Sequence, residues 1–195
     1  MSLELDPAKT ALVVIDMTKR VFSLESRPHP IQEVLTKTAR LAKAFRQARS
    51  FVVLVRVSSR DGKDVLKPIT DPTPPALLLP APVQRTEDWS DLVSELGSHP
   101  LDHLVTKHQW GAFFGTDLDL QLRRRQIETI VLCGIATNIG VETTAREAYQ
   151  HGYNQIFATD AMNAYSEEEH RHSSTYIFPR IGLIRSTDEI IAAIH

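Results

Sequence analysis

Asp16, Lys107 and a glycine-containing turn at residues 134–140 each follow a short apolar stretch of the sequence. Asp16 comes after ALVVI, Lys107 after HLVT, and the turn after IVLC. In open parallel sheets, ligands bind just beyond the carboxyl ends of the strands, so three such positions can gather at one edge. A helix that starts after the turn would offer its backbone N–H groups to a ligand's negative charge. Alone, an aspartate after a strand is usually a turn former or helix cap, and a lysine is usually solvated. Their joint position favours a functional site.

The sequence alternates between strand-like and helix-like segments. Apolar runs predict strands at Thr10–Ile15, Phe51–Val57, His103–Thr106, Thr129–Cys133, Gln155–Ala158 and Leu183–Arg185. Nearly continuous Val, Ile and Leu runs are typical of strands covered on both faces. The predicted fold is therefore α/β, a three-layer αβα arrangement around a six-stranded, mainly parallel sheet with Rossmann-like topology.

Helical segments are indicated by apolar spacing and by their starts. Helical spacing recurs between the first two strands, at Ile31, Val34, Leu35, Leu41, Ala42 and Phe45. It recurs more weakly at Leu118 and Leu122, before the fourth strand. Capping-box spacing at Ser166 with Glu169, and at Ser186 with Glu189, predicts two further helix starts.

Bulk composition indicates one globular domain over residues 1–195. Apolar residues make up 42% and charged residues 24%, and the net charge is −2 with both signs interspersed, so no nucleic-acid partner is expected. The longest apolar runs are too short to cross a bilayer, and no basic and then apolar signal pattern opens the chain. We expect a cytoplasmic protein without a membrane partner. The single cysteine, Cys133, excludes an internal disulfide and a thiolate metal cluster.

Residues 58–82 interrupt the alternation. This segment holds six of the eleven prolines and little periodicity. Irregular segments of that length are usually functional or disordered. We expect a structured loop that borders the site or reaches a neighbouring subunit, with a variable surface loop as the alternative.

Three blocks of the sequence resemble the isochorismatase-like hydrolases, also called the cysteine hydrolase superfamily. The family pattern G-[VI]-x-T-[DN]-x-C-V followed by T-A-R is matched at Gly134, Ile135, Thr137, Asn138, Val141 and Thr144–Arg146. The block nearest the N-terminus, VVIDMTKRVF, resembles the family strand that ends in I-D-M-Q. The middle block, TKHQWGAFFGTDLDLQL, places Lys107, Phe113, Thr116 and Leu118 in family positions. The resemblance spans almost the whole chain and is specific for the fold, but it is a poor guide to substrate.

The resemblance implies roles for individual residues. It implies Asp16 as the catalytic acid or base and Lys107 as its cationic partner, with each group favouring the charged form of the other. It also implies a non-proline cis peptide between Ile135 and Ala136. The substrate would then lie against the turn residues Ile135, Ala136, Ile139 and Gly140.

Gly140 occupies the position at which most members carry their nucleophilic cysteine. A covalent thioester route is therefore not expected. Isochorismatases, which split a vinyl ether, share this glycine, so the implied mechanism is non-covalent acid/base chemistry on a small anionic metabolite. The turn reads GIATN, with Ala136 where those enzymes tend to have tyrosine, and in this respect it is similar to the amidase branch.

Two other readings stay open at this point. One is an amidase that uses Cys133, although a cysteine inside an apolar strand is usually inert. The other is a binding protein that kept the pocket and lost catalysis.

Four further side chains are expected to line the pocket: Phe22, Gln109, Trp110 and Phe113. Trp110 and Phe113 are equally suited to the core.

No metal is expected, because VRVSSRDGKD lacks the histidine that some relatives use, and no nucleotide motif indicates a cofactor. The family often assembles, so a homo-oligomer is expected.

Overall fold

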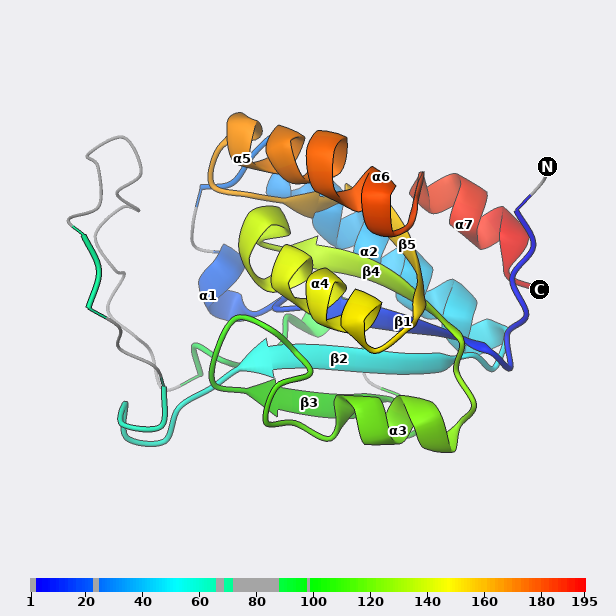
Figure 1. Ribbon diagram of the computed structural model, residues 1–195, viewed down its shortest axis with the longest axis horizontal. Helices are drawn as coiled ribbons and strands as arrows, with labels where there is room; N and C mark the ends of the chain where they lie inside the picture. Colours follow the sequence, from blue (N-terminus) through cyan, green and yellow to red (C-terminus); the bar gives the residue numbers. More distant parts are fainter. Residues whose placement is uncertain (1–2, 23–24, 66–68, 72–87, 98) are drawn as a thin grey trace.

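A parallel sheet with helices on both faces forms the body of the molecule (Figure 1). A computed structural model describes residues 3–22, 25–65, 69–71, 88–97 and 99–195. Within these residues the sheet has six strands: β1 (Thr10–Ile15), β2 (Phe51–Val57), β3 (His103–Lys107), β4 (Thr129–Ile135), β5 (Asn154–Asn163) and β6 (Leu183–Arg185). Their spatial order is β3-β2-β1-β4-β5-β6, and all neighbouring pairs are parallel. The predicted three-layer α/β class is confirmed.

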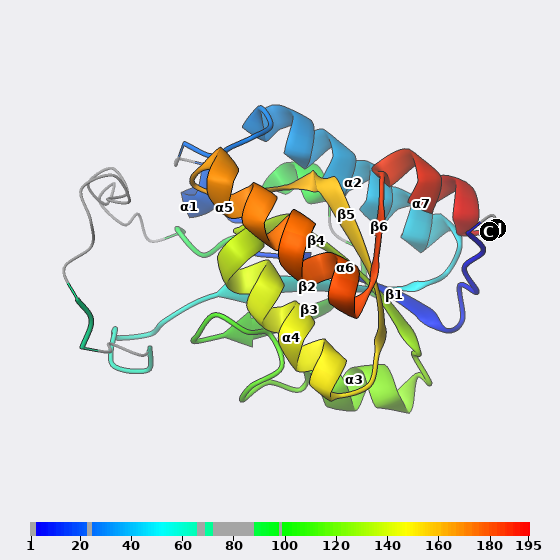
Figure 2. The same ribbon diagram turned by 45° about the horizontal axis from the view of Figure 1, so that its top comes forward.

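The helices divide into two layers, as Figure 2 shows. Their bounds are α1 (Lys19–Phe22), α2 (Ile31–Gln47), α3 (Leu118–Arg124), α4 (Glu142–Gln150), α5 (Glu167–His172), α6 (Phe178–Ile181) and α7 (Thr187–Ala193). Short turns of other helical types are η2 (Ser94–Leu96), η3 (Thr137–Val141) and η4 (Ser173–Ile177). Apolar side chains of α2 and α7 pack on one face of the sheet, and those of α3, α4 and α6 pack on the other.

The spacing in the sequence accounts for this packing. The buried face of α2 consists of Val34, Leu35, Thr38, Leu41, Ala42 and Phe45, so the predicted helical stripe is confirmed. Leu118 and Leu122 of α3 are both fully buried. Both predicted capping boxes are present, at the starts of α5 and α7.

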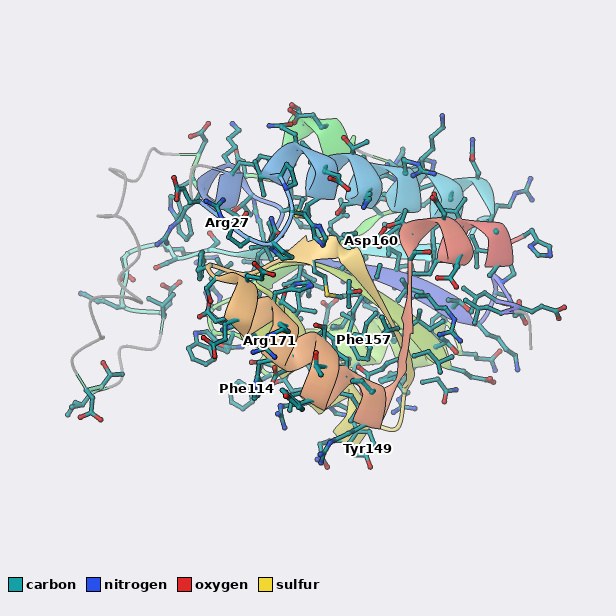
Figure 3. All side chains as sticks on the ribbon, turned by 90° about the horizontal axis from the view of Figure 1, so that it is seen from above. Arg27, Phe114, Tyr149, Phe157, Asp160 and Arg171 are labelled. Carbon is teal, nitrogen blue, oxygen red and sulfur yellow. The ribbon has the colours of Figure 1, made fainter. Side chains whose placement is uncertain are left out.

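Three strands run further than their apolar cores predict, and β3 does so by one residue, to Lys107. β4 continues through Gly134 to Ile135, and β5 continues past Ala158 to Asn163, with a shift of register opposite Leu132–Gly134. The polar Asp160 in this extension caps α7, because its Oδ1 accepts the Thr187 N–H at 2.9 Å, and it also pairs with Lys37 of α2. Figure 3 shows Asp160 on the side of β5 that faces α2 and α7, and Phe157 on the side of α6. Asp160 therefore ends the apolar run without ending the strand.

The order of the strands creates one crevice at the carboxyl ends of β1 and β4. The chain winds outward from β1 through β2 to β3 and in the other direction from β4 through β5 to β6. Ligands of doubly wound sheets bind at this reversal of direction. Helix α1 lies at the end of the sheet to which the strand arrows point (Figure 1).

Gly134 lets β4 approach β1 closely at this point. Its φ is +113°, and a Cβ there would lie 2.1 Å from the backbone oxygen of Ile15. Only glycine fits such a contact. The turn that follows β4 is therefore held directly beside Asp16, which follows Ile15.

Part of the segment 58–82 lies in the described region. Residues 58–65 and 69–71 are described, and Val65 lines the cavity at the crevice. The rest of this prediction lies outside the described residues. Within the described residues, none of the helices has the length and hydropathy needed to cross a bilayer.

Candidate active site

Asp16 and Lys107 form a buried ion pair at the crevice. The Lys107 Nζ lies 2.7 Å from the Asp16 Oδ2, and Lys107 is only 2% exposed. The two side chains come from positions 91 residues apart in the sequence, and parallel pairing of β1, β2 and β3 brings them together. The predicted meeting of a carboxylate and an ammonium group is thus present.

Asp16 is held in an uncommon backbone conformation. Its φ is +50°, and its N–H donates to the Val55 carbonyl at 3.0 Å. Left-handed backbone at a residue other than glycine is often found at functional sites. This conformation belongs to the turn by which the chain leaves β1.

Burial dominates the electrostatics of Asp16. Loss of water raises the pKa of this carboxyl above its ordinary value, and the charge and hydrogen bond of Lys107 oppose that rise. Among the described residues, Oδ1 of Asp16 has no hydrogen-bond partner. Oδ1 is itself buried, so Asp16 has one oxygen bonded to the ammonium group and a second, buried oxygen without a partner among the described residues.

The ammonium group of Lys107 is held from two sides. Besides Asp16, it donates to the Trp110 carbonyl at 2.7 Å. Trp110 lies in the loop between β3 and α3, and this loop is fixed to α4 because the Ala112 N–H donates to the Thr144 hydroxyl at 3.1 Å. The loop backbone thereby aims the lysine at Asp16.

Gly140 faces the ion pair. A Cβ at this position would lie 3.2 Å from Asp16 Oδ2, 3.3 Å from Lys107 Nζ and 3.0 Å from Ile15 Cγ2. Such contacts are tighter than side chains normally make, so any side chain at position 140 would require these groups to shift by a few tenths of an ångström.

The turn at residues 135–140 is attached to α5 by two side-chain contacts. The Thr137 hydroxyl lies 2.9 Å from His170 Nδ1, and Asn138 Nδ2 donates to Glu169 Oε1 at 3.1 Å. The peptide bond between Ile135 and Ala136 is cis. Burial, and in smaller part the charge of His29, lowers the pKa of His170 to about 4.

A cavity of about 720 Å³ opens over the ion pair. Of the predicted site residues, eight line it: Asp16, Lys107, Gln109, Trp110, Ile135, Ala136, Ile139 and Gly140. These eight residues lie at or just after the carboxyl ends of β1, β3 and β4.

Phe22 and Phe113 are not among the lining residues, and these two predictions need correction. Phe113 is 6% exposed and stacks on His151 at 5.1 Å, so it belongs to the core under α3 and α4. Phe22 packs against the core on the α2 face. The next residue, Phe114, lines the cavity in place of Phe113 and is 71% exposed.

Several lining residues were not predicted from the sequence. Arg20, Glu147 and Tyr165 line the cavity from α1, α4 and the segment after β5. Tyr165 follows the carboxyl end of a strand and could have been found by the rule that found Asp16. Arg20 and Glu147 lie within helices and carry no such signal.

Cys133 lies away from the cavity. It is fully buried in β4, on the face of the sheet covered by α2, and burial raises the pKa of its thiol to about 12. A thiol in this state is a poor nucleophile. In the described part of the chain, no group of three or more His, Cys, Asp or Glu side chains is placed to hold a metal ion.

Comparisons with known proteins agree with this architecture. The model of the isochorismatase domain matches residues 10–189. The chain is 50% identical to the uncharacterized isochorismatase family protein YwoC of Bacillus subtilis, over 97% of this chain and 96% of that protein. It is 47% identical to the uncharacterized isochorismatase family protein YecD of Escherichia coli O157:H7, over 98% of this chain and 100% of that protein.

A solved structure has the same fold along the whole chain. The isochorismatase family protein from Burkholderia thailandensis superposes with a TM-score of 0.89 at 44% identity, covering 100% of this chain and 99% of that one. The six-stranded parallel sheet with helices on both faces places the chain in the α/β class. The chain belongs to the isochorismatase family of hydrolases.

Proposed function

We propose that this hydrolase cleaves a small anionic metabolite by non-covalent acid/base chemistry. In this proposal Asp16 is the catalytic acid and Lys107 its cationic partner. One observation supports it most directly: the Asp16 carboxylate and the Lys107 ammonium group meet at 2.7 Å beside Gly140, which has no side chain to act as a nucleophile. The reaction needs no cofactor.

Asp16 has the properties that a proton donor requires. Burial raises the pKa of its carboxyl, so the protonated form persists closer to neutral pH. Lys107 limits this rise and holds Oδ2 at 2.7 Å. The carboxyl lines the cavity beside Gly140, where a substrate can meet it.

Vinyl-ether hydrolysis fits these groups. The proton of Asp16 passes to the terminal enol carbon, and the ether oxygen stabilises the resulting oxocarbenium ion. Water adds to the carbon that bears the ether oxygen, its proton returns to Asp16, and the resulting hemiketal collapses to a ketone and an alcohol. Lys107 and Arg20 supply positive charge in the cavity for the substrate's carboxylate.

Two alternatives differ from this proposal in testable ways. Amide cleavage by Cys133 has little support, because that thiol is buried outside the cavity. Binding without turnover is favoured by the absence of a nucleophile at Gly140. The cytoplasmic location and the homo-oligomer stay predictions.

A substrate panel tests the proposal. Vinyl ethers including isochorismate, small amides and small esters are incubated with the purified protein and with the Asp16→Asn and Lys107→Ala variants. We expect turnover of a vinyl ether by the wild type and a loss of about a hundredfold or more in each variant. Binding without turnover across the panel, or full turnover by both variants, would refute the assignment.

A further inference from the structure

A second depression lies at the edge of the sheet from which the strands start, opposite the edge that carries the ion pair (Figure 1). Its volume is about 600 Å³, and residues at the ends of α2 and α3 and at the start of β2 line it. The charged residues in this lining are Arg46, Arg49, Arg125 and Asp102, so three cations accompany one carboxylate among the described residues. In a chain whose net charge is −2, such a local excess of positive charge favours an anionic ligand.

The carboxylate of Asp102 is already paired. Its Oδ1 accepts a hydrogen bond from Arg46 Nε at 3.2 Å, and its Oδ2 accepts one from Arg46 Nη2 at 2.7 Å and one from the His99 N–H at 3.2 Å. Arg46 Nη1 donates in addition to the Leu96 carbonyl at 2.9 Å. Asp102 and Arg46 therefore form a fixed, neutral wall of the depression, and both carboxylate oxygens are occupied.

The other polar side chains of the depression have unused donors. The guanidinium of Arg125 lies over the ring of Phe51, 4.1 Å from its centroid, where only Nη1 has hydrogen-bond partners among the described residues. The side chain of Arg49 has no hydrogen-bond or ion-pair partner among these residues. His99 Nδ1 accepts the N–H of Leu101 at 3.2 Å, so in the neutral ring the proton is on Nε2, which can donate. These three side chains therefore offer donors to a ligand.

Arg49 has a backbone conformation that normally favours glycine. Its φ is +60°, and it follows α2 in a Schellman motif, since its N–H donates to the Arg46 carbonyl at 3.1 Å and the Ser50 N–H to the Phe45 carbonyl at 2.9 Å. The partial negative charge of a helix C-terminus favours a cation nearby, but it does not require one at this position. Left-handed backbone at a residue other than glycine is often found at functional sites. A ligand for the Arg49 side chain would account for an arginine here.

We propose that this depression binds a phosphate group, either free or carried by a small organic molecule as a monoester, through Arg49, Arg125 and His99 Nε2. A guanidinium presents paired N–H donors that match two phosphate oxygens. Pro7 and Ile127 line the same depression and can contact the organic part of a monoester. The site lies at the other end of the strands from Asp16, so it does not depend on the proposed function.

Titration of the full chain, followed by protein NMR at constant ionic strength, tests this inference. The probes are inorganic phosphate and phenyl phosphate. We expect saturable binding of at least one probe with a Kd of about 1 mM or tighter. The amide signals of Gly97, Leu101 and Gln126 should shift, and those of Ala136 and Gly140 should not. Tighter binding of phenyl phosphate would support a monoester as the ligand, and equal binding would support free phosphate.

Four variants assign the binding to individual side chains. Arg49→Gln and Arg125→Gln should each weaken binding about tenfold, because each removes charge-assisted hydrogen bonds. Arg124→Gln is the matched control, since Arg124 is exposed, next to Arg125, and not among the lining residues, and it should stay within about twofold of the wild type. Arg49→Gly should weaken binding as much as Arg49→Gln, yet unfold at a higher urea concentration, because glycine adopts the positive φ without strain.

Three results would overturn the inference: no saturable binding of either probe, a loss in Arg124→Gln as large as in Arg49→Gln, or shifts centred on Gly140. The second result would indicate general screening of surface charge, and the third would place the anion at the ion pair. If Arg125→Gln does not fold, the two Arg49 variants decide the question. Asp16→Asn should bind the probes as the wild type does, so a failure of the catalytic proposal leaves this test unchanged.

Discussion

The Asp16 carboxyl predicts a definite pH dependence. Burial raises its pKa, and the protonated form is the proposed acid. The rate constant kcat/KM should therefore be highest at low pH and should fall as pH rises through this raised pKa, above the ordinary range for aspartate. A pH–rate profile measures this. A rate that increases with pH over the same range would indicate that the carboxylate acts as a base.

The Gly140→Cys variant tests whether a cysteine thiol at position 140 is reactive beside the ion pair. The new Cβ would lie within 3.3 Å of Lys107 Nζ and within 3.2 Å of Asp16 Oδ2, so the ion pair must shift. We expect a loss of at least tenfold in the native reaction. The thiol beside an ammonium group should be alkylated by iodoacetamide, whereas the wild type, whose one cysteine is buried, should resist. Mass spectrometry distinguishes the two, and an unmodified variant would contradict the placement of Gly140.

The ion pair of Asp16 and Lys107 could be predicted from the sequence, but the choice of Phe114 as a lining residue could not. Asp16 and Lys107 each follow an apolar strand, and parallel pairing alone brings them to one edge. The choice between Phe113 and Phe114 depends on the loop after β3. Hydrogen bonds from Ala112 and Phe113 to α4 fix that loop, over separations of 32 and 34 residues. No local pattern reveals contacts of that range.

At the scale of elements, Gly134 determines how β4 meets β1. A Cβ at this position would lie 2.1 Å from the Ile15 oxygen, a backbone atom that cannot move aside. Gly134→Ala should therefore destabilise the protein by about 3 kcal/mol or more. Gly152→Ala is the matched control, because Gly152 also has positive φ, +82°, but nothing lies within 4 Å of its Cβ position. That variant should lose only about 1 kcal/mol. Equal losses in urea unfolding would contradict this account of the contact.

The burial of His170, the α5 residue that contacts Thr137 of the turn, makes stability depend on pH. Burial, with a smaller effect of His29, lowers the pKa of His170 from 6.5 to about 4, so the folded state resists protonation. This contribution is complete above about pH 6.5 and is lost as pH falls towards 4. Between pH 7.5 and 4.5 the wild type should lose on the order of 2 kcal/mol more than His170→Gln does. The exposed His172, substituted in the same way, should leave the wild-type slope unchanged.

Most of the strands could be predicted from the sequence. The six apolar runs are the six strands of the described sheet, because strands covered on both faces need continuous apolar residues. The length of β5 could not be predicted, because the polar Asp160 lies within the strand, where it accepts a hydrogen bond from the start of α7 and pairs with Lys37. In the sequence alone, such a polar residue looks the same as one that ends a strand.

At the scale of the molecule, the strand order places the chemistry. The reversal between β1 and β4 leaves a crevice into which Asp16 and the turn at residues 135–140 both open. The sequence predicts that the strands are parallel. Their spatial order in the sheet depends in addition on the face of the sheet on which each connecting helix packs. That arrangement is shared with the solved isochorismatase family protein, whose TM-score of 0.89 covers the whole chain.

The proposed mechanism as a whole assigns catalysis to the carboxyl of Asp16 and none to the sole thiol. The most direct test compares kcat for Asp16→Asn with kcat for Cys133→Ala, on the substrate that the panel identifies. The asparagine variant should lose about a hundredfold or more, and the alanine variant should stay within about twofold of the wild type. A fully active Asp16→Asn, or an inactive Cys133→Ala that folds normally, would contradict the account.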